Sequence, residues 1–166
     1  MAVPPERLTQ RLQLSAPRLA DAPDLFRFMG DPAAMRHTHC TASLREMRRE
    51  IACDVHQSRK RGFGPWTVRQ AGTIIGYGGL SVDSSEPGYG PEVVYFFARA
   101  AWGKGYAGEL VAASLDYARA TKLTEISAFV HPDNAASRRV LDRAGFTVER
   151  FVPKLTRWML RCDLNR

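Results

Sequence analysis

The sequence of 166 residues carries a net charge of +7, with 45% hydrophobic and 25% charged residues. This length is usual for one domain, so we expect residues 1–166 to form a single domain, and the balanced composition excludes a disordered chain or a fibre. No apolar run reaches the ~20 residues of a membrane helix, and the N-terminus lacks the apolar core of a signal peptide. Because the three cysteines have no paired metal spacing, we expect a reduced, cytoplasmic protein with no membrane association.

The basic residues are spread along the chain rather than gathered in one block. Most of them are arginine, and the densest stretch, 45–61, interleaves them with Glu46, Glu50 and Asp54. This pattern is typical of a solvated helix and does not favour nucleic acid as a partner, although a basic RNA-binding domain stays an alternative. A positive potential also attracts small anionic ligands such as phosphates, which is a third interpretation.

Two helices are predicted in the N-terminal part, after a strand at 10–15 where polar and apolar residues alternate. Asp21 stands before an Ala-Pro pair, a pattern that predicts a helix N-cap with proline in the first turn. Ser43, with Glu46 three residues later, forms a capping-box pattern and predicts the start of a second helix. Apolar residues at helical spacing continue that helix until just before Gly62.

The rest of the chain alternates apolar strand patterns with two further amphipathic helices. The predicted strands are 64–69, 73–82, 92–97, 125–130, 146–152 and 156–163, and the predicted helices run from the turn at 103–108 to about 120 and from Asn134 to Gly145. Glycines at 76, 78 and 79 indicate a bulge or a close backbone approach in the second of these strands. Hairpins and crossovers both occur in the order β-α-α-β-β-β-α-β-α-β-β, which indicates an α/β fold with a mixed sheet.

A glycine-rich turn at 103–108 matches G-x-G-x-x-G between an apolar strand and an amphipathic helix. Backbone N–H groups at such a helix N-terminus, together with the helix dipole, form a site for phosphate oxygens, and Lys104 adds positive charge. An ordinary tight strand-to-helix turn is the alternative. A Rossmann site is excluded because the turn follows three strands joined as hairpins, and no P-loop pattern occurs.

Two ordered segments carry a resemblance to a known family. The stretch from Glu92 through Trp102-Gly-Lys-Gly-Tyr-Ala-Gly to Glu109 resembles the acyl-CoA segment of the GNAT superfamily of N-acetyltransferases, and Asn134 to Phe146 resembles its next segment. Residues 18–25 and 64–66 are similar to the branch that contains the ribosomal-protein N-terminal (alanine) acetyltransferases. The resemblance covers nearly the whole chain.

The resemblance implies a GNAT-type sheet with splayed central strands, acetyl-CoA as the acyl donor, and no metal. The pantetheine arm would lie between the splayed strands and the pyrophosphate on the glycine-rich turn. The cofactor-binding residues so implied are Phe97, Ala98, Trp102, Gly103, Lys104, Gly105, Tyr106, Ala107, Gly108 and Asn134. Trp102 departs from the Gln or Arg of the family signature, which puts one side-chain contact to phosphate in doubt.

The same resemblance implies the catalytic roles. Glu92 stands where many relatives carry the base that takes a proton from the attacking ammonium; a strand-end salt bridge is the alternative. The position of the usual tyrosine proton donor is Leu141, so Ser137 is our candidate to assist the leaving thiolate, with a capping or packing serine as the alternative. A backbone N–H near Phe97 would meet the oxyanion, and His131 is an alternative base.

Other candidates receive less support. His37 and His39 lack a third ligand at a metal spacing, so a solvated or substrate-loop role is favoured, and Cys40 is unnecessary as a nucleophile if transfer is direct. The resemblance therefore implies direct acetyl transfer, in a ternary complex, to a protein N-terminal α-amine or a small-molecule amine. An inactive CoA-binding module is the alternative. The acceptor depends on the loops at 31–45 and 83–91 and on the last hairpin, and both monomer and homodimer remain open.

Overall fold

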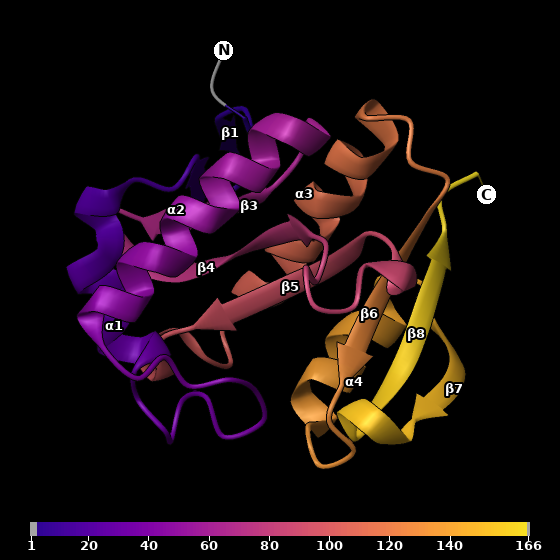
Figure 1. The fold of residues 1–166 in the computed structure, drawn as a ribbon. Helices are drawn as coiled ribbons and strands as arrows, with labels where there is room; N and C mark the ends of the chain where they lie inside the picture. Colours follow the sequence, from indigo (N-terminus) through magenta and orange to yellow (C-terminus); the bar gives the residue numbers. More distant parts are fainter. Residues whose placement is uncertain (1–2, 166) are drawn as a thin grey trace.

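An eight-stranded sheet runs through the protein in the order β1-β2-β3-β4-β5-β6-β8-β7 (Figure 1). The structure, a computed structural model, describes residues 3–165. The strands are β1 (Arg7–Leu8), β2 (Gln13–Ser15), β3 (Pro65–Gln70), β4 (Thr73–Ser81), β5 (Glu92–Phe97), β6 (Glu125–Val130), β7 (Thr147–Val152) and β8 (Arg157–Asp163). The helices are α1 (Ala22–Met29), α2 (Leu44–Arg61), α3 (Tyr106–Ala120) and α4 (Ala135–Arg143). The predicted α/β fold and its element order are confirmed, with the two-residue β1 added at the edge.

The helices lie on both faces of the sheet (Figure 1), and a cluster of buried residues lies beneath each pair. Helices α1 and α2 cover one face, where Leu25 and Met47 are buried with Tyr77 of β4. Helices α3 and α4 cover the other face, where Leu110 and Leu141 are buried. Because helices cover both faces, a ligand would reach the middle of the sheet through a gap between two neighbouring strands. Within residues 3–165, no helix combines the length and apolarity needed to cross a membrane.

The predicted cap of α2 is confirmed, with one change in its partner. Ser43 Oγ accepts a hydrogen bond from Glu46 N at 3.1 Å, and Gly62 ends the helix at φ +79°. The Glu46 carboxylate reaches Ala42 N at 2.7 Å rather than the N–H of Ser43. The second hydrogen bond of the capping box is therefore donated by Ala42, one residue before the N-cap.

Asp21 is the N-cap residue of α1 with proline in the first turn, as expected, but its side chain makes no capping hydrogen bond. The position two residues into the helix is Pro23, which has no N–H to donate. The buried carboxylate accepts instead from Arg18 N at 3.0 Å and Thr67 Oγ1 at 2.9 Å, and it forms an ion pair with Arg69 at 2.6 Å. Asp21 thus ties the start of α1 to β3.

The strands β5 and β6 diverge, as Figure 1 shows. They are parallel neighbours that share a single registered pair, Glu92 with Ser127, whereas β5 pairs with β4 along its whole length. The expected splayed sheet is therefore confirmed. The glycines of β4 permit its close approach to β5: a Cβ on Gly78 would lie 2.3 Å from Val94 O.

Candidate active site

A cavity of about 620 Å³ lies where β5 and β6 separate. Its walls come from residues 34–38 of the α1–α2 connection, residues 92–97 of β5, the glycine-rich turn, the end of β6, α4, and Arg157 of β8. Segments far apart in the sequence thus meet around one space. The predicted site residues that line it are Glu92, Phe97, Trp102, Gly103, Gly105, Tyr106, Ala107, Gly108, Asn134 and Ser137.

Ala98 and Lys104 are the two predicted residues that the structure does not bring into this wall. The Ala98 N–H donates to Ile75 O at 2.9 Å, so it is used within the sheet. The Lys104 side chain is exposed, and its carbonyl oxygen accepts from Arg11 Nη1 at 2.7 Å. Direct roles for these two residues in cofactor binding stay predictions without support from the geometry.

The glycine-rich turn presents the N-terminus of α3 to the cavity. Gly103 and Gly105 adopt φ of +72° and +82°, a region that side chains with a Cβ rarely occupy. Helix α3 begins at Tyr106, so the N–H groups of its first turn have no partner within the helix. A Cβ on Gly108 would meet no atom within 4 Å, which leaves open space beside these donors. The turn therefore fits an anionic group such as pyrophosphate.

The edge of β5 that faces the cavity carries backbone donors. Residues in an antiparallel ladder alternate between bonded and non-bonded pairs. Because Ala98 N bonds to Ile75 of β4, Phe97 and, two residues earlier, Tyr95 are in non-bonded positions, and their N–H groups point toward the side from which β6 has diverged. The Phe97 carbonyl accepts from Trp102 Nε1 at 3.0 Å, so the Trp102 indole N–H is used within the protein.

Glu92 begins β5 in the cavity wall and is partly buried. Burial raises the pKa of its carboxyl group to about 7, and the nearby negative charge of Asp83 adds to this effect. Among residues 3–165, no hydrogen bond or ion pair involves the carboxylate, so the salt-bridge interpretation has no support. A carboxyl group that titrates near neutral pH is suited to proton transfer.

Asn134 and Ser137 lie together at the start of α4. Asn134 Oδ1 accepts from Ser137 N at 3.1 Å, so the predicted cap is confirmed, and the amide nitrogen of Asn134 remains as a donor. Ser137 Oγ lies 2.7 Å from Tyr95 Oη of β5. Burial raises the pKa of Tyr95 to about 12, although the bond to Ser137 acts in the opposite direction. The sequence does not predict this contact, because the two hydroxyl groups belong to residues 42 positions apart.

His37 and His39, which were considered above as a metal-binding pair, contact different residues. His37 stacks on His131 with ring centroids 5.1 Å apart. His39 Nε2 lies 3.3 Å from Glu46 Oε1 and 3.5 Å from Glu50 Oε1, and the three ligand atoms lie within 4.8 Å of one another. When protonated, His39 forms ion pairs that join its loop to the start of α2.

His131 uses one of its ring nitrogens within its own loop. Its Nδ1 accepts from Asp133 N at 3.1 Å, so Nε2 carries the proton of the neutral ring. The stacked His37 has a lowered pKa, first through burial and then through the charge of Arg36. Arg157 Nη2 donates to His37 O at 2.7 Å and holds this wall of the cavity in place.

The acidic residues of the 83–91 loop have partners inside the protein. Asp83 Oδ1 accepts from Ser85 N at 2.8 Å and from Ser85 Oγ at 2.6 Å. Glu86 forms an ion pair with Lys154, which joins this loop to the segment before β8. Of these two acids, Asp83 is the one that acts on Glu92 electrostatically.

The family model for the acetyltransferase (GNAT) domain matches residues 11–147. The chain belongs to the GNAT acetyltransferase family. The predicted resemblance is therefore confirmed at the level of the family, and the matched region contains the glycine-rich turn, Glu92, Asn134 and Ser137.

Individual relatives of this GNAT chain agree with that assignment. An uncharacterised N-acetyltransferase, p20 of Bacillus licheniformis, is 29% identical over 147 residues, which cover 85% of this chain and 82% of the relative. The crystal structure of an acetyltransferase from Agrobacterium tumefaciens superposes with a TM-score of 0.84 at 25% identity, covering 95% of this chain and 94% of the other. The structure of RimL, a ribosomal L7/L12 α-N-protein acetyltransferase in complex with coenzyme A, has a TM-score of 0.76 at 18% identity, with 95% and 96% covered.

Proposed function

We propose that this protein transfers an acetyl group from acetyl-CoA to a primary amine by direct attack within a ternary complex. The observation that carries the proposal is Glu92, a carboxyl group with a pKa of about 7 in the wall of the cavity between the diverging strands. The acceptor would be the N-terminal α-amine of a protein or a small-molecule amine. The three cysteines are free thiols, which supports a cytoplasmic location.

The residues around the cavity fit acetyl-CoA. The unpartnered N–H groups at the start of α3 would bind the pyrophosphate. The N–H groups of Tyr95 and Phe97 would hold the extended arm along β5, as a neighbouring strand would, with the amide nitrogen of Asn134 as a further donor. Acetyl-CoA supplies an acetyl group on a thioester, with a thiolate as the leaving group.

Glu92 would act on the acceptor. An ammonium must lose a proton before its nitrogen lone pair can form the new C–N bond, and the Glu92 carboxylate would accept that proton. A backbone N–H of β5 near Phe97 that does not bind the arm would stabilise negative charge on the carbonyl oxygen as that bond forms. As the C–S bond breaks, Ser137, which is hydrogen bonded to Tyr95, would donate a hydrogen bond to the sulfur.

The test combines a binding measurement with turnover. Calorimetric titration with acetyl-CoA should give a heat of binding, and release of the CoA thiol should then be measured over N-terminal peptides, polyamines, amino acids and aminoglycosides. Peptides come first because one protein of similar fold is named as an α-N-protein acetyltransferase. Absence of acetyl-CoA binding up to millimolar concentration would refute the proposal. Binding without turnover would instead identify a CoA-binding module, and binding of RNA alone an RNA-binding domain.

A further inference from the structure

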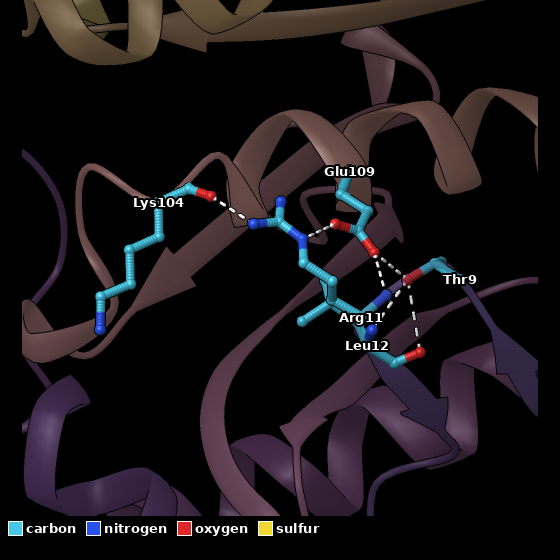
Figure 2. Close-up of polar contacts among 5 residues, drawn as sticks. All are labelled: Thr9, Arg11, Leu12, Lys104 and Glu109. Atoms are coloured by element: carbon cyan, nitrogen blue, oxygen red, sulfur yellow. Dashed lines mark hydrogen bonds and ion pairs between the residues drawn. The ribbon is translucent and has the colours of Figure 1, made fainter.

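A short N-terminal segment lies against the glycine-rich turn and the start of α3 (Figure 2). Glu109, in the first turn of α3, accepts from Thr9 Oγ1 at 2.5 Å, from Arg11 N at 2.7 Å and from Arg11 Nε at 2.8 Å. Thr9 N also donates to Leu12 O at 2.9 Å, which closes the connection between β1 and β2 into a tight turn. The segment is thus fastened to α3 through one carboxylate, which is 13% exposed.

The Arg11 guanidinium continues from Glu109 onto the glycine-rich turn itself. Its Nη1 donates to Lys104 O at 2.7 Å, and its central carbon lies 4.6 Å from the centre of the Tyr106 ring. A Cβ on Gly105 would lie 3.3 Å from Nη2, so the guanidinium also lies against that residue. Figure 2 shows the Lys104 side chain extending away from Arg11, so the contact is with the backbone alone.

This contact fixes the direction of one peptide group. In a planar trans peptide the carbonyl of one residue and the N–H of the next point in opposite directions. Because the Lys104 carbonyl points at Arg11, the Gly105 N–H points away from Arg11, and Gly105 lies in the cavity wall. Arg11 itself does not line the cavity. The same bond keeps a carbonyl oxygen, which would repel an anion, turned away from that space.

Arg11 also compensates a charge that would oppose an anion. Burial alone would raise the pKa of Glu109, but the bonds from Thr9 and Arg11 outweigh it and lower the pKa, so the carboxylate is ionised at neutral pH. An ionised carboxylate one turn from the helix start would repel phosphate unless it were paired. The ion pair with Arg11 supplies that compensation.

We propose that Arg11 is a positioning residue that sets the direction of the Lys104–Gly105 peptide and so prepares the turn to bind the pyrophosphate of acetyl-CoA. This inference rests on the proposed function. The sequence alone does not predict this role of Arg11, because Arg11 and Lys104 are 93 residues apart and no residue of the turn indicates an arginine partner. The ligand recognised through this device is the diphosphate group, not the acyl group or the acceptor.

The test compares Arg11→Ala with wild type for CoA binding by calorimetry and for turnover. We expect the Kd for CoA and the KM for acetyl-CoA to rise about ten-fold, a change of about 1.4 kcal/mol, with kcat at saturation changed less than about two-fold. Arg27→Ala is the matched control, because Arg27 is an exposed arginine paired only on the surface with Asp24. Should Arg11→Ala not fold, Arg11→Lys keeps the charge and the stem but loses the planar fork that bonds Glu109 and Lys104 O through separate nitrogens, and it should still raise Kd.

Two further measurements separate the explanations. S-acetyl-pantetheine lacks the diphosphate, so Arg11→Ala should use it with the kcat/KM of wild type; an equal loss with this donor would overturn the role at the turn. The double variant Arg11→Ala/Glu109→Gln removes the uncompensated carboxylate and should keep the raised Kd; full recovery would show a charge effect and overturn the peptide-orientation role. If wild type itself bound no CoA, the proposed function would fail, whereas wild-type binding with an unchanged Kd in Arg11→Ala would refute this inference alone.

Discussion

Glu92→Gln keeps the shape of the side chain and removes its basicity. With a pKa of about 7, Glu92 is about one tenth ionised at pH 6 and about nine tenths ionised at pH 8. We therefore expect kcat/KM of wild type to rise through an acidic limb with its midpoint near pH 7, and Glu92→Gln to lose that limb together with a factor of ~10²–10⁴ in kcat. Higher pH should partly restore the variant by supplying free amine, and CoA affinity should hardly change.

The same substitution should stabilise the fold at alkaline pH. The pKa of Glu92 is higher in the folded protein than the ordinary 4.5, so its ionisation opposes folding, and this cost is fully present above pH 7. The shift corresponds to about 3 kcal/mol, which Glu92→Gln should recover at pH 8 and which should fade toward pH 4, where the carboxyl group is neutral in both states.

Thiol release measured from pH 5 to 9, and urea unfolding at pH 4 and pH 8, test both parts. A variant that keeps full kcat and the acidic limb would show that another group is the base. If the variant were less stable than wild type at pH 8, burial of the ionised carboxylate would not lower the free energy of unfolding.

Three further changes test neighbouring parts of the structure. Asp83→Asn removes the negative charge that helps raise the pKa of Glu92, so the acidic limb of the pH–rate profile should move to lower pH; an unmoved limb would contradict the coupling. Gly105→Asp places a side chain at φ +82° against the Arg11 guanidinium, where its carboxylate would compete with Lys104 O for that group and add negative charge to the turn. KM for acetyl-CoA should therefore rise at least ~10-fold, measured by thiol release, and an unchanged KM in a folded variant would place the cofactor elsewhere. Asp21→Ala leaves the Arg69 guanidinium without its partner in a nearly buried site, and urea unfolding should show a loss of about 3–5 kcal/mol, whereas a loss below about 1 kcal/mol would mean that the pair is effectively solvated.

Local signals predicted most elements because their causes are local. The cap at Ser43, the glycine that ends α2, and the apolar spacing of β5 and α3 each depend on residues within one or two turns. The edge strand β1 was missed because it has two residues, and Leu8 is exposed, so no alternation marks it. The ion pair of Asp21 with Arg69 was not predicted, because the sheet brings together two residues that lie 48 positions apart in the sequence.

The parts of the site that one continuous segment forms could be predicted, and the contacts between segments far apart in the sequence were missed. The glycine-rich turn could be predicted from contiguous residues and Glu92 from the family resemblance, and Glu92 and all of the turn but Lys104 line the cavity. The bond between Tyr95 and Ser137 and the contact of Arg11 with Lys104 O join residues 42 and 93 positions apart. Such contacts leave no periodic pattern in the sequence, since the distance between the two residues in space depends on how the elements between them fold.

Arg157 holds the 34–38 wall of the cavity through a main-chain oxygen, that of His37, and not through a side chain. Every amino acid supplies this carbonyl, so the anchor persists whatever side chains the wall carries. Substitutions in residues 34–38 can therefore change the chemistry of the cavity while the backbone of this segment keeps its position. A lineage with this device can diverge in what its cavity accepts at little cost to folding, and the permissive positions are the exposed cavity residues on either side of the anchor, Arg36 and Thr38.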